Sequence, residues 1–391
     1  MSEWKEKSLG ELTSLMTKGI APIYVEVENE NTVRVLNQKC NRDFRISYAD
    51  SRLNDLVKKK VSEERFIKPG DVLINSTGAG TAGRVAQIWN IPYRTTIDGH
   101  MILLRSAGEI DPLYYGYALK MQQSKIESFA EGSTGQTEIN RDRLSNEISI
   151  LYPVDRKEQN RIAHILSDID EKIQVNERIN DNLLQQAQIL FANTFPYTPD
   201  DVLPNCWRKG TVGDIVDIHD SKRIPLSGAQ REKMIARTYP YYGAASLMDY
   251  VDDYIFDGIY LLLGEDGTVI DDAGYPILQY VWGQFWVNNH AHILTGKNGY
   301  SVESLLLLFK KTSVQSIVTG AVQPKISQAN LRSIPVVIPD IDTLTSFNAS
   351  IKPVFDQIRH NTDQNKALAQ LRDTLLPRLM SGEIDVSNIR S

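Results

Sequence analysis

Apolar residues recur in alternating steps of four and three along two long segments of the chain. A repeat held over about four heptads is typical of coiled-coil helices. The first seam comprises Ile162, Leu166, Ile169, Ile173, Asn176, Asn180, Leu183, Ala187 and Leu190. The second comprises Phe347, Ile351, Val354, Ile358, Asn361, Asn365, Leu368, Arg372, Leu375 and Leu379.

Capping residues and prolines set the expected ends of the two helices. The first should start after Pro153, with Asp155 as N-cap, and stop near Phe195. The second should start after Pro339 and end around residues 377–382, with a break or kink at Pro353. At 1.5 Å per residue, the first helix would be roughly 60 Å long, well over one turn of B-DNA.

Asparagines occupy equivalent positions in both seams, which favours pairing of the two helices. Buried asparagines in a seam fix the register at a cost in stability. We therefore predict a long antiparallel two-helix coiled coil. The alternative is two separate amphipathic helices, each packed on its own domain.

The segments between the helices contain short β-rich runs that end in glycine or proline, such as DVLIN, HMILLRS, IYLLLG and AHILTG. Such strands mixed with helices predict an α+β fold.

The chain also repeats itself at a spacing of about 190 residues. WKEKSLGEL at Trp4–Leu12 matches WRKGTVGDI at Trp207–Ile215, and PGDVLIN at 69–75 matches DGIYLLLG at 257–264. Further on, 136–148 matches 323–335, and 173–185 matches 358–370 without a gap. Four collinear matches indicate a duplication.

The duplication predicts two globular domains and internal pseudo-two-fold symmetry. We assign residues 1–153 and 198–339 to the two domains, and residues 154–197 and 340–391 to the two helical regions. In such an arrangement Trp4 should lie near the end of the second helix, as Trp207 follows the first.

Composition predicts a soluble intracellular protein. The longest aliphatic run, Leu305–Phe309, is too short to cross a membrane, and MSEWKEKSLGEL has no secretory pattern. Two cysteines, Cys40 and Cys206, cannot form a disulfide scaffold, so a reducing cytoplasm is the expected location.

The net charge of −6 argues against a protein that grips nucleic acid over its whole surface. Basic residues nevertheless cluster locally in both halves, and phosphate binding requires only such clusters. In the first half they are Arg34, Lys39, Arg42, Arg45 and Lys58–Lys60; in the second they are Lys222, Arg223, Arg231, Lys233 and Arg237.

Catalytic motifs are incomplete. GAGTAG at 78–83 has dinucleotide-site spacing but leads into RVAQIW rather than a helix, and NIPY at 90–93 departs from the Asn-Pro-Pro-Tyr motif of adenine methyltransferases at Ile91. His290 and His292 lack an evident third metal ligand, so we expect neither a metal nor a cofactor.

The order of its repeated segments and long helices makes the chain resemble the specificity subunits of Type I restriction-modification systems over nearly its whole length. The resemblance rests on the two openings at Trp4 and Trp207, PVDRKEQNRIAHILSDID at the first helix, KRIPL, YPYYGAA and LLLGEDG in the second domain, and LRDTLLPRLMSGEI at the end. The second helical region departs from the family pattern after Pro339.

The resemblance implies a non-catalytic subunit that recognises a bipartite DNA sequence. Each target-recognition domain would contact one half-site of double-stranded DNA, and the coiled coil would set the spacer. Two methyltransferase subunits would dock on the helical regions and supply adenine-N6 chemistry, and restriction subunits would join through the complex.

Basic, amide and aromatic side chains in the loops of the two domains are the candidates for contacts with bases and phosphates. They are Lys58, Lys59, Lys60, Arg84, Arg94 and Gln136 in the first domain, and Lys222, Arg223, Arg231, Lys233, Arg237, Tyr241, Tyr242 and Gln323 in the second. Two other functions stay open, a self-contained adenine methyltransferase with a recognition module and a coiled-coil scaffold that joins proteins.

Overall fold

A computed structural model describes residues 3–130, 138–320 and 322–387. The chain forms two compact units, each of which contains one globular domain and half of each long helix. Unit 1 comprises residues 1–175 and 364–391, and unit 2 comprises residues 176–363. Among the described residues, none of the helices is both long and apolar enough to span a membrane.

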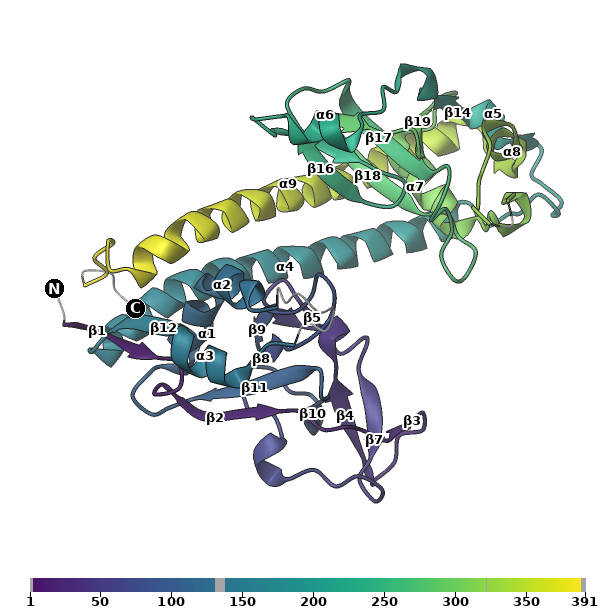
Figure 1. The fold of residues 1–391 in the computed structure, drawn as a ribbon. Helices are drawn as coiled ribbons and strands as arrows, with labels where there is room; N and C mark the ends of the chain where they lie inside the picture. Colours follow the sequence, from purple (N-terminus) through teal and green to yellow (C-terminus); the bar gives the residue numbers. More distant parts are fainter. Residues whose placement is uncertain (1–2, 131–137, 321, 388–391) are drawn as a thin grey trace. The chain divides into compact units, whose positions relative to one another are not determined.

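Two four-stranded sheets form the framework of unit 1 (Figure 1). The first has the order β2-β11-β8-β9 and the second the order β10-β4-β7-β3. Their strands are β2 (Thr13–Lys18), β3 (Tyr24–Val25), β4 (Thr32–Leu36), β7 (Arg52–Asp55), β8 (Val72–Asn75), β9 (Val85–Gln87), β10 (Thr95–Ile97) and β11 (Met101–Ser106).

The first sheet of unit 1 is buried on both faces, which explains the continuous apolar runs of its strands. Ile102 and Leu104 point into the core shared with the helices, whereas Met101 and Leu103 point into the core shared with the second sheet. Helix α1 (Pro112–Met121) packs on the helix-side face and is followed by α2 (Gln123–Ser128) and α3 (Arg141–Glu147).

Unit 2 is built on one six-stranded sheet with the order β14-β19-β17-β18-β15-β16. Its strands are β14 (Val216–Ile218), β15 (Tyr239–Tyr242), β16 (Leu247–Val251), β17 (Phe256–Gly264), β18 (Leu278–Val287) and β19 (Ala291–Gly296). Its short helices are α5 (Val212–Ile215), α6 (Gly228–Glu232), α7 (Val302–Lys311) and α8 (Gln328–Ser333). Strand alternation again separates two cores, with Leu261 and Leu263 on one side and Leu262 on the other.

The first strand of each domain pairs antiparallel with its last strand, directly before a long helix. In unit 1, β1 (Trp4–Ser8) pairs with β12 (Ser149–Pro153). In unit 2, β13 (Arg208–Thr211) pairs with β20 (Pro335–Ile338). The matching sequence segments therefore adopt the same local topology in both units.

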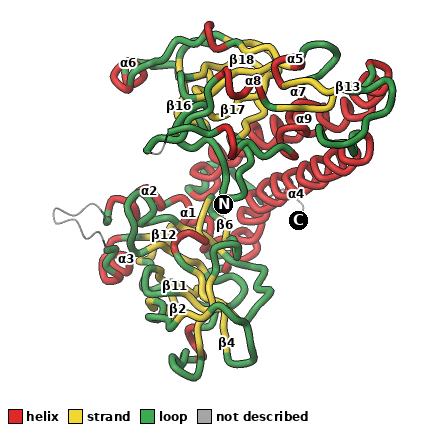
Figure 2. The backbone as a smooth tube through the Cα atoms, turned by 90° about the vertical axis from the view of Figure 1, so that its right-hand side faces the viewer, coloured by secondary structure: helices red, strands yellow, loops and turns green. Residues whose placement is uncertain are grey.

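The long helices are α4 (Arg156–Thr194) and α9 (Ile341–Met380), coloured red in Figure 2. Asp155 caps α4 as predicted, because its carboxylate accepts a hydrogen bond from the Lys157 amide at 3.0 Å. The expected break at Pro353 is wrong, since helical structure continues through it. Pro353 is exposed, so its ring does not disturb a packed face.

Within each unit the two helix segments run antiparallel. In unit 1, Arg372 of α9 contacts Asp170 of α4, and the Asn365 amide donates to the carbonyl of Ile173 at 3.2 Å. In unit 2, the Asn361 amide donates to Oδ1 of Asn180 at 2.9 Å, so two predicted seam asparagines face one another.

Burial along the predicted seams is uneven. Ile162, Leu166, Ile173 and Asn176 are buried. The structure differs at Leu190, which is 39% exposed, while the adjacent Phe191 is buried against Phe347. The residues along the predicted seams that lie half-buried are Ile169, Asn180, Leu183, Val354, Ile358, Asn365, Leu368, Arg372 and Leu375.

Each opening tryptophan packs at the end of a long helix. In unit 1, Trp4 lies against Gly382, where a Cβ atom would come within 2.9 Å of the indole, and Gly382 has a φ of +75° that ends α9. In unit 2, Trp207 packs on Phe195 just beyond α4 and donates from its indole to Asp340. The predicted position of Trp4 near the end of the second helix is confirmed.

Candidate functional site

The basic candidates of unit 1 lie mostly at its surface. Lys58 and Lys60 are exposed and Lys59 is half-buried in the turn after β7. Arg94 is exposed but pairs with Glu63 at 2.9 Å and covers the ring of Phe66. Gln136 lies outside the described residues.

Arg84 lines a hollow of about 280 Å³ between the glycine loop and a short hairpin. The hairpin consists of β5 (Asn41–Arg42) and β6 (Arg45–Ile46), and its tip also lines the hollow. Nη2 of Arg84 donates to the carbonyl of Gly80 at 3.0 Å, which orients the guanidinium group. No helix follows the GAGTAG loop, which leads into β9, as expected for a simple glycine turn.

The candidates of unit 2 divide into exposed and internally paired residues. Lys222, Lys233 and Gln323 are exposed. Arg231 and Arg237 both pair with Asp249, at 2.6 and 3.6 Å.

Three candidates of unit 2 are buried or partly buried. Tyr241 is 2% exposed and its hydroxyl is hydrogen-bonded to the backbone of Leu226, so its expected role in DNA contact is wrong. Tyr242, the next residue, is half-buried. Arg223 is 13% exposed and pairs with Asp220 and Glu265, which makes it part of a buried cluster.

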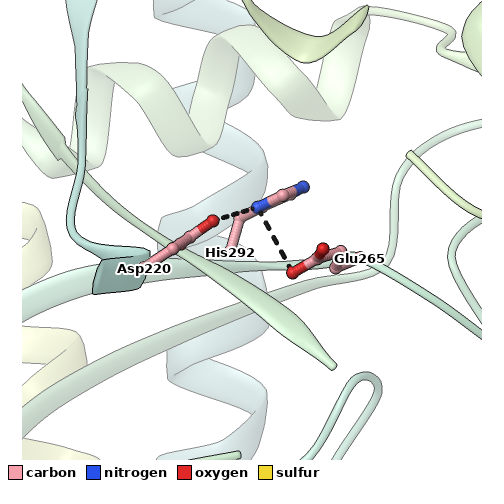
Figure 3. Close-up of side chains that lie close together, drawn as sticks. All are labelled: Asp220, Glu265 and His292. Carbon is pink, nitrogen blue, oxygen red and sulfur yellow. Dashed lines mark hydrogen bonds and ion pairs between the residues drawn. The ribbon is translucent and has the colours of Figure 1, made fainter. Parts of the chain in front are cut away.

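Three motifs of the second domain meet in this cluster, and Figure 3 shows Asp220, Glu265 and His292 from it. His292 on β19 is fully buried, and its Nδ1 lies 2.6 Å from Oδ2 of Asp220 and 3.8 Å from Oε2 of Glu265. Nη1 of Arg223 lies 2.6 Å from the same Glu265 oxygen. The cluster therefore joins residues 220–223, the GEDG turn after β17 and strand β19.

The cluster also ties down the loop before α8. Nε2 of His292 lies 2.8 Å from the carbonyl oxygen of Ile326, and the Gln328 side chain donates to Asp220 at 2.6 Å. Lys325 pairs with Glu265 at 3.3 Å. Two loops that carry predicted recognition residues are thus held by one set of buried charges.

Both ring nitrogens of His292 lie beside oxygen atoms. Nδ1 faces the Asp220 carboxylate and Nε2 faces the carbonyl oxygen of Ile326. Burial raises the pKa of Asp220, but the hydrogen bond and charge of His292, the Ile293 amide and Arg223 outweigh it and lower that pKa overall. The three side chains are close enough to hold a cation, but Arg223 already binds Glu265 and Gln328 already binds Asp220, so the group forms a network of ion pairs and hydrogen bonds within the protein.

Sequence reasoning missed this cluster because its members are far apart in the chain. Asp220 precedes His292 by 72 residues, and nothing in the local pattern distinguishes it from a surface acid. The signals in the sequence were LLLGEDG and KRIPL, which placed Glu265 and Arg223 in distinctive motifs, and the His290–His292 pair, which had no evident partner.

A second buried ion pair lies in unit 1, where α1 meets the long helices. Asp170 of α4 accepts from Arg372 of α9 at 2.6 Å and from the hydroxyl of Tyr117 at 2.7 Å. The ammonium group of Lys120 lies 3.7 Å from Asp170 and 4.6 Å from the ring centroid of Phe44. These contacts attach the globular part of unit 1 to its helix segments.

Burial lowers the pKa of Lys120 to about 8, although Asp170 acts in the opposite direction. A lysine whose pKa falls on folding destabilises the folded state below that pKa, and the penalty is relieved as the pH rises. We expect the stability of unit 1 to urea to rise from about pH 8 to pH 9.5 relative to Lys120→Met. The measurement compares the two proteins by urea unfolding across this pH range, with hydrogen exchange of α1 as the probe of unit 1. Equal pH profiles for the two proteins would contradict this expectation.

The two sites do not account for the methyltransferase-like NIPY segment. Residues 90–93 form an exposed loop between β9 and β10, and Tyr93 is 45% exposed against Arg34 and Tyr48.

Sequence comparison decides the family. A sequence model described as the Type I restriction modification DNA specificity domain matches residues 1–185 and again residues 204–369. The chain belongs to this family. The family expected from the sequence motifs is therefore confirmed, and its two matches coincide with the two halves of the repeat.

Relatives and a solved structure agree with the Type I specificity family. The MjaIX specificity subunit of Methanocaldococcus jannaschii is 25% identical over 378 residues, which cover 88% of this chain and 84% of that protein. The HindI specificity subunit of Haemophilus influenzae is 22% identical, with 98% of this chain and all of that protein covered. The S subunit from M. genitalium has the same fold, with a TM-score of 0.56, 18% identity and coverage of 97% of this chain and 96% of its own.

Proposed function

We propose that this chain is the subunit that selects the DNA sequence for a Type I restriction-modification complex. Each globular domain recognises one half of a bipartite target in double-stranded DNA, and the paired helices act as a coiled coil that sets the spacer. The chain itself performs no catalysis.

The observation that carries this proposal is the strand pairing repeated at the start of each long helix. Both units pair an opening strand with a closing strand, β1 with β12 and β13 with β20, directly before a long helix. Two similar recognition modules on one chain suit a target in two parts, just as protein symmetry is matched by half-site spacing in other DNA-binding proteins.

Membership of the Type I specificity family supports a proposal for the partner proteins of this chain. Two methyltransferase subunits dock on the helical regions and supply adenine-N6 methylation, and restriction subunits join through the same complex. The net charge of −6 is consistent with sharing phosphate contacts with these partners.

Basic, amide and aromatic residues that are exposed or half-buried supply the proposed contacts with DNA. We retain Lys58, Lys59, Lys60, Arg84 and Arg94 in unit 1, and Lys222, Arg231, Lys233, Arg237, Tyr242 and Gln323 in unit 2. Arg223 and Tyr241 act instead within the protein.

A domain exchange tests the proposal. Residues 1–153 are replaced by those of another specificity subunit, and methylated adenines are mapped in a host that also carries the methyltransferase. We expect one half of the methylated sequence to change while the other half and the spacer persist. An unchanged pattern would contradict recognition by this domain, and S-adenosylmethionine binding by the purified chain would favour a self-contained methyltransferase.

A further inference from the structure

The β5–β6 hairpin of unit 1 presents an arginine and an aspartate side by side at an exposed tip. Its two turn residues, Asp43 and Phe44, have φ values of +53° and +63°, as in the tight hairpin turn that follows the natural twist of a strand pair. Arg42 and Asp43 are both exposed. Within the described part of the chain, neither side chain has a hydrogen bond or ion pair.

The hairpin is held firmly although its tip is free. Asn41, 1% exposed, donates from Nδ2 to the carbonyl of Arg84 at 2.9 Å and to Oδ1 of Asn75 at 3.2 Å. Phe44 packs on Tyr117, with ring centroids 5.2 Å apart. The position of the tip is therefore determined by the core of unit 1, and little backbone freedom is lost when it meets a ligand.

Three other basic residues of unit 1 have carboxylate partners within the protein. Arg34 pairs with Glu28, Arg94 with Glu63, and Lys58 with Asp55. Arg42 and Asp43 carry opposite charges on adjacent residues yet do not pair with each other. Their donors and acceptor are therefore available to a ligand that offers both kinds of group.

The edge of a G·C base pair in the major groove offers this combination. Guanine presents two acceptors, N7 and O6, which a guanidinium group can bind together, and cytosine presents the N4 amino donor, which a carboxylate can accept. The major groove also admits a two-stranded β-ribbon. Arg84, on the opposite side of the 280 Å³ hollow, adds a positive charge where the hairpin would approach the DNA.

We infer that Arg42 and Asp43 are specificity-determining residues that recognise a G·C pair in the half-site of unit 1, Arg42 through guanine and Asp43 through cytosine. This inference rests on the proposed function. A phosphate contact would need the arginines alone and would be opposed by the Asp43 carboxylate, so base recognition accounts better for the pair.

The test maps methylated sequences in a host that carries this chain with its methyltransferase. Arg42→Ala removes the guanine contact, and Asp43→Asn removes the pure acceptor while keeping a residue that tolerates a positive φ. We expect discrimination at one G·C position of one half-site to fall by about 5- to 150-fold in each variant, with the other half-site unchanged. Lys5→Ala, an exposed charge on β1, should leave the sequence unchanged.

The outcomes separate this inference from the proposed function. If the unaltered complex methylates no defined bipartite sequence, the proposed function fails. If it does, but both variants keep the same sequence preference, the inference fails. A uniform loss of affinity for all DNA, with a shallower dependence on salt, would make these residues phosphate contacts and would also overturn it.

Discussion

Replacing Asp220 by asparagine should lower the free energy of unfolding of unit 2 by about 3 to 5 kcal/mol, the range for breaking a buried ion pair by removing one partner. Asp220 accepts from His292, from Gln328 and from the Ile293 amide, and its side chain is 3% exposed. The variant leaves the fully buried His292 and the Arg223 guanidinium group without this carboxylate, while the amide group cannot accept the same set of donors.

The measurement is hydrogen exchange of the peptides from β17, β19 and α8, together with urea unfolding. Asp217→Asn, an exposed acid on β14, is the matched control and should change stability by less than about 0.5 kcal/mol. Equal protection in the two variants would show that the cluster does not hold unit 2 together. Because the loop that carries Gln323 depends on the cluster, methylation in the host should fall with stability.

The pH dependence of this cluster has a definite sign. The pKa of Asp220 is lower in the folded protein than its ordinary value of 3.8, so the folded state binds the ionised form more strongly. Its contribution to stability is complete above about pH 4 and is lost as the pH falls through the lower, folded-state pKa. The Asp220→Asn protein should therefore be less stable than the unaltered protein at neutral pH. It should also lose less additional stability than the unaltered protein when the pH is lowered into the acid range.

The second large effect is expected in unit 1, where Asp170→Asn should reduce the free energy of unfolding by about 3 to 5 kcal/mol. Asp170 is 8% exposed and joins Arg372, Tyr117 and Lys120. When Asp170 loses its negative charge, the guanidinium group of Arg372 and the ammonium group of Lys120 remain close together where little water reaches them. The N-terminal half of α4 should then detach more easily from α1 and from the C-terminal half of α9.

Hydrogen exchange of α1 and of residues 364–380 measures this loss. Asp168→Asn, an exposed change on the same helix, is the control and should leave the exchange unchanged. If Asp170→Asn and the control behaved alike, the attachment would have to come from apolar contacts such as Leu166 and Leu379 alone. If unit 1 recognises one half-site, as proposed above, methylation should become less selective at that half-site when the domain loses its fixed place on the helices.

Periodic features were predicted well from the sequence. The heptad spacing anticipated α4 and α9 and the facing pair Asn180 and Asn361, because a helix brings residues three and four apart onto one face. Local signals also placed the Asp155 cap. Pro353 misled the prediction because proline costs a helix one hydrogen bond, and 40 residues of continuous helix with packed neighbours offset that loss.

Single side chains were predicted less well. Arg223 and Tyr241 have the residue types of DNA contacts, but one is tied to Glu265 and the other is buried under Leu226. Arg42 was assigned only to a basic cluster, and Asp43 was not singled out. Whether a polar side chain is free or paired depends on residues distant in the chain, which local composition does not report.

The sequence by itself determined the duplication, the two long helices, the strand-and-turn character of each domain and the family, since each follows from order and spacing along the chain. Only the tertiary structure decided that Asp220, Glu265 and His292 meet, that Asp170 joins three elements, and that the Arg42–Asp43 tip stays unpaired on a fixed hairpin. Those outcomes depend on contacts between segments 34 to more than 200 residues apart, where burial removes competing water and makes each charge depend on its partner.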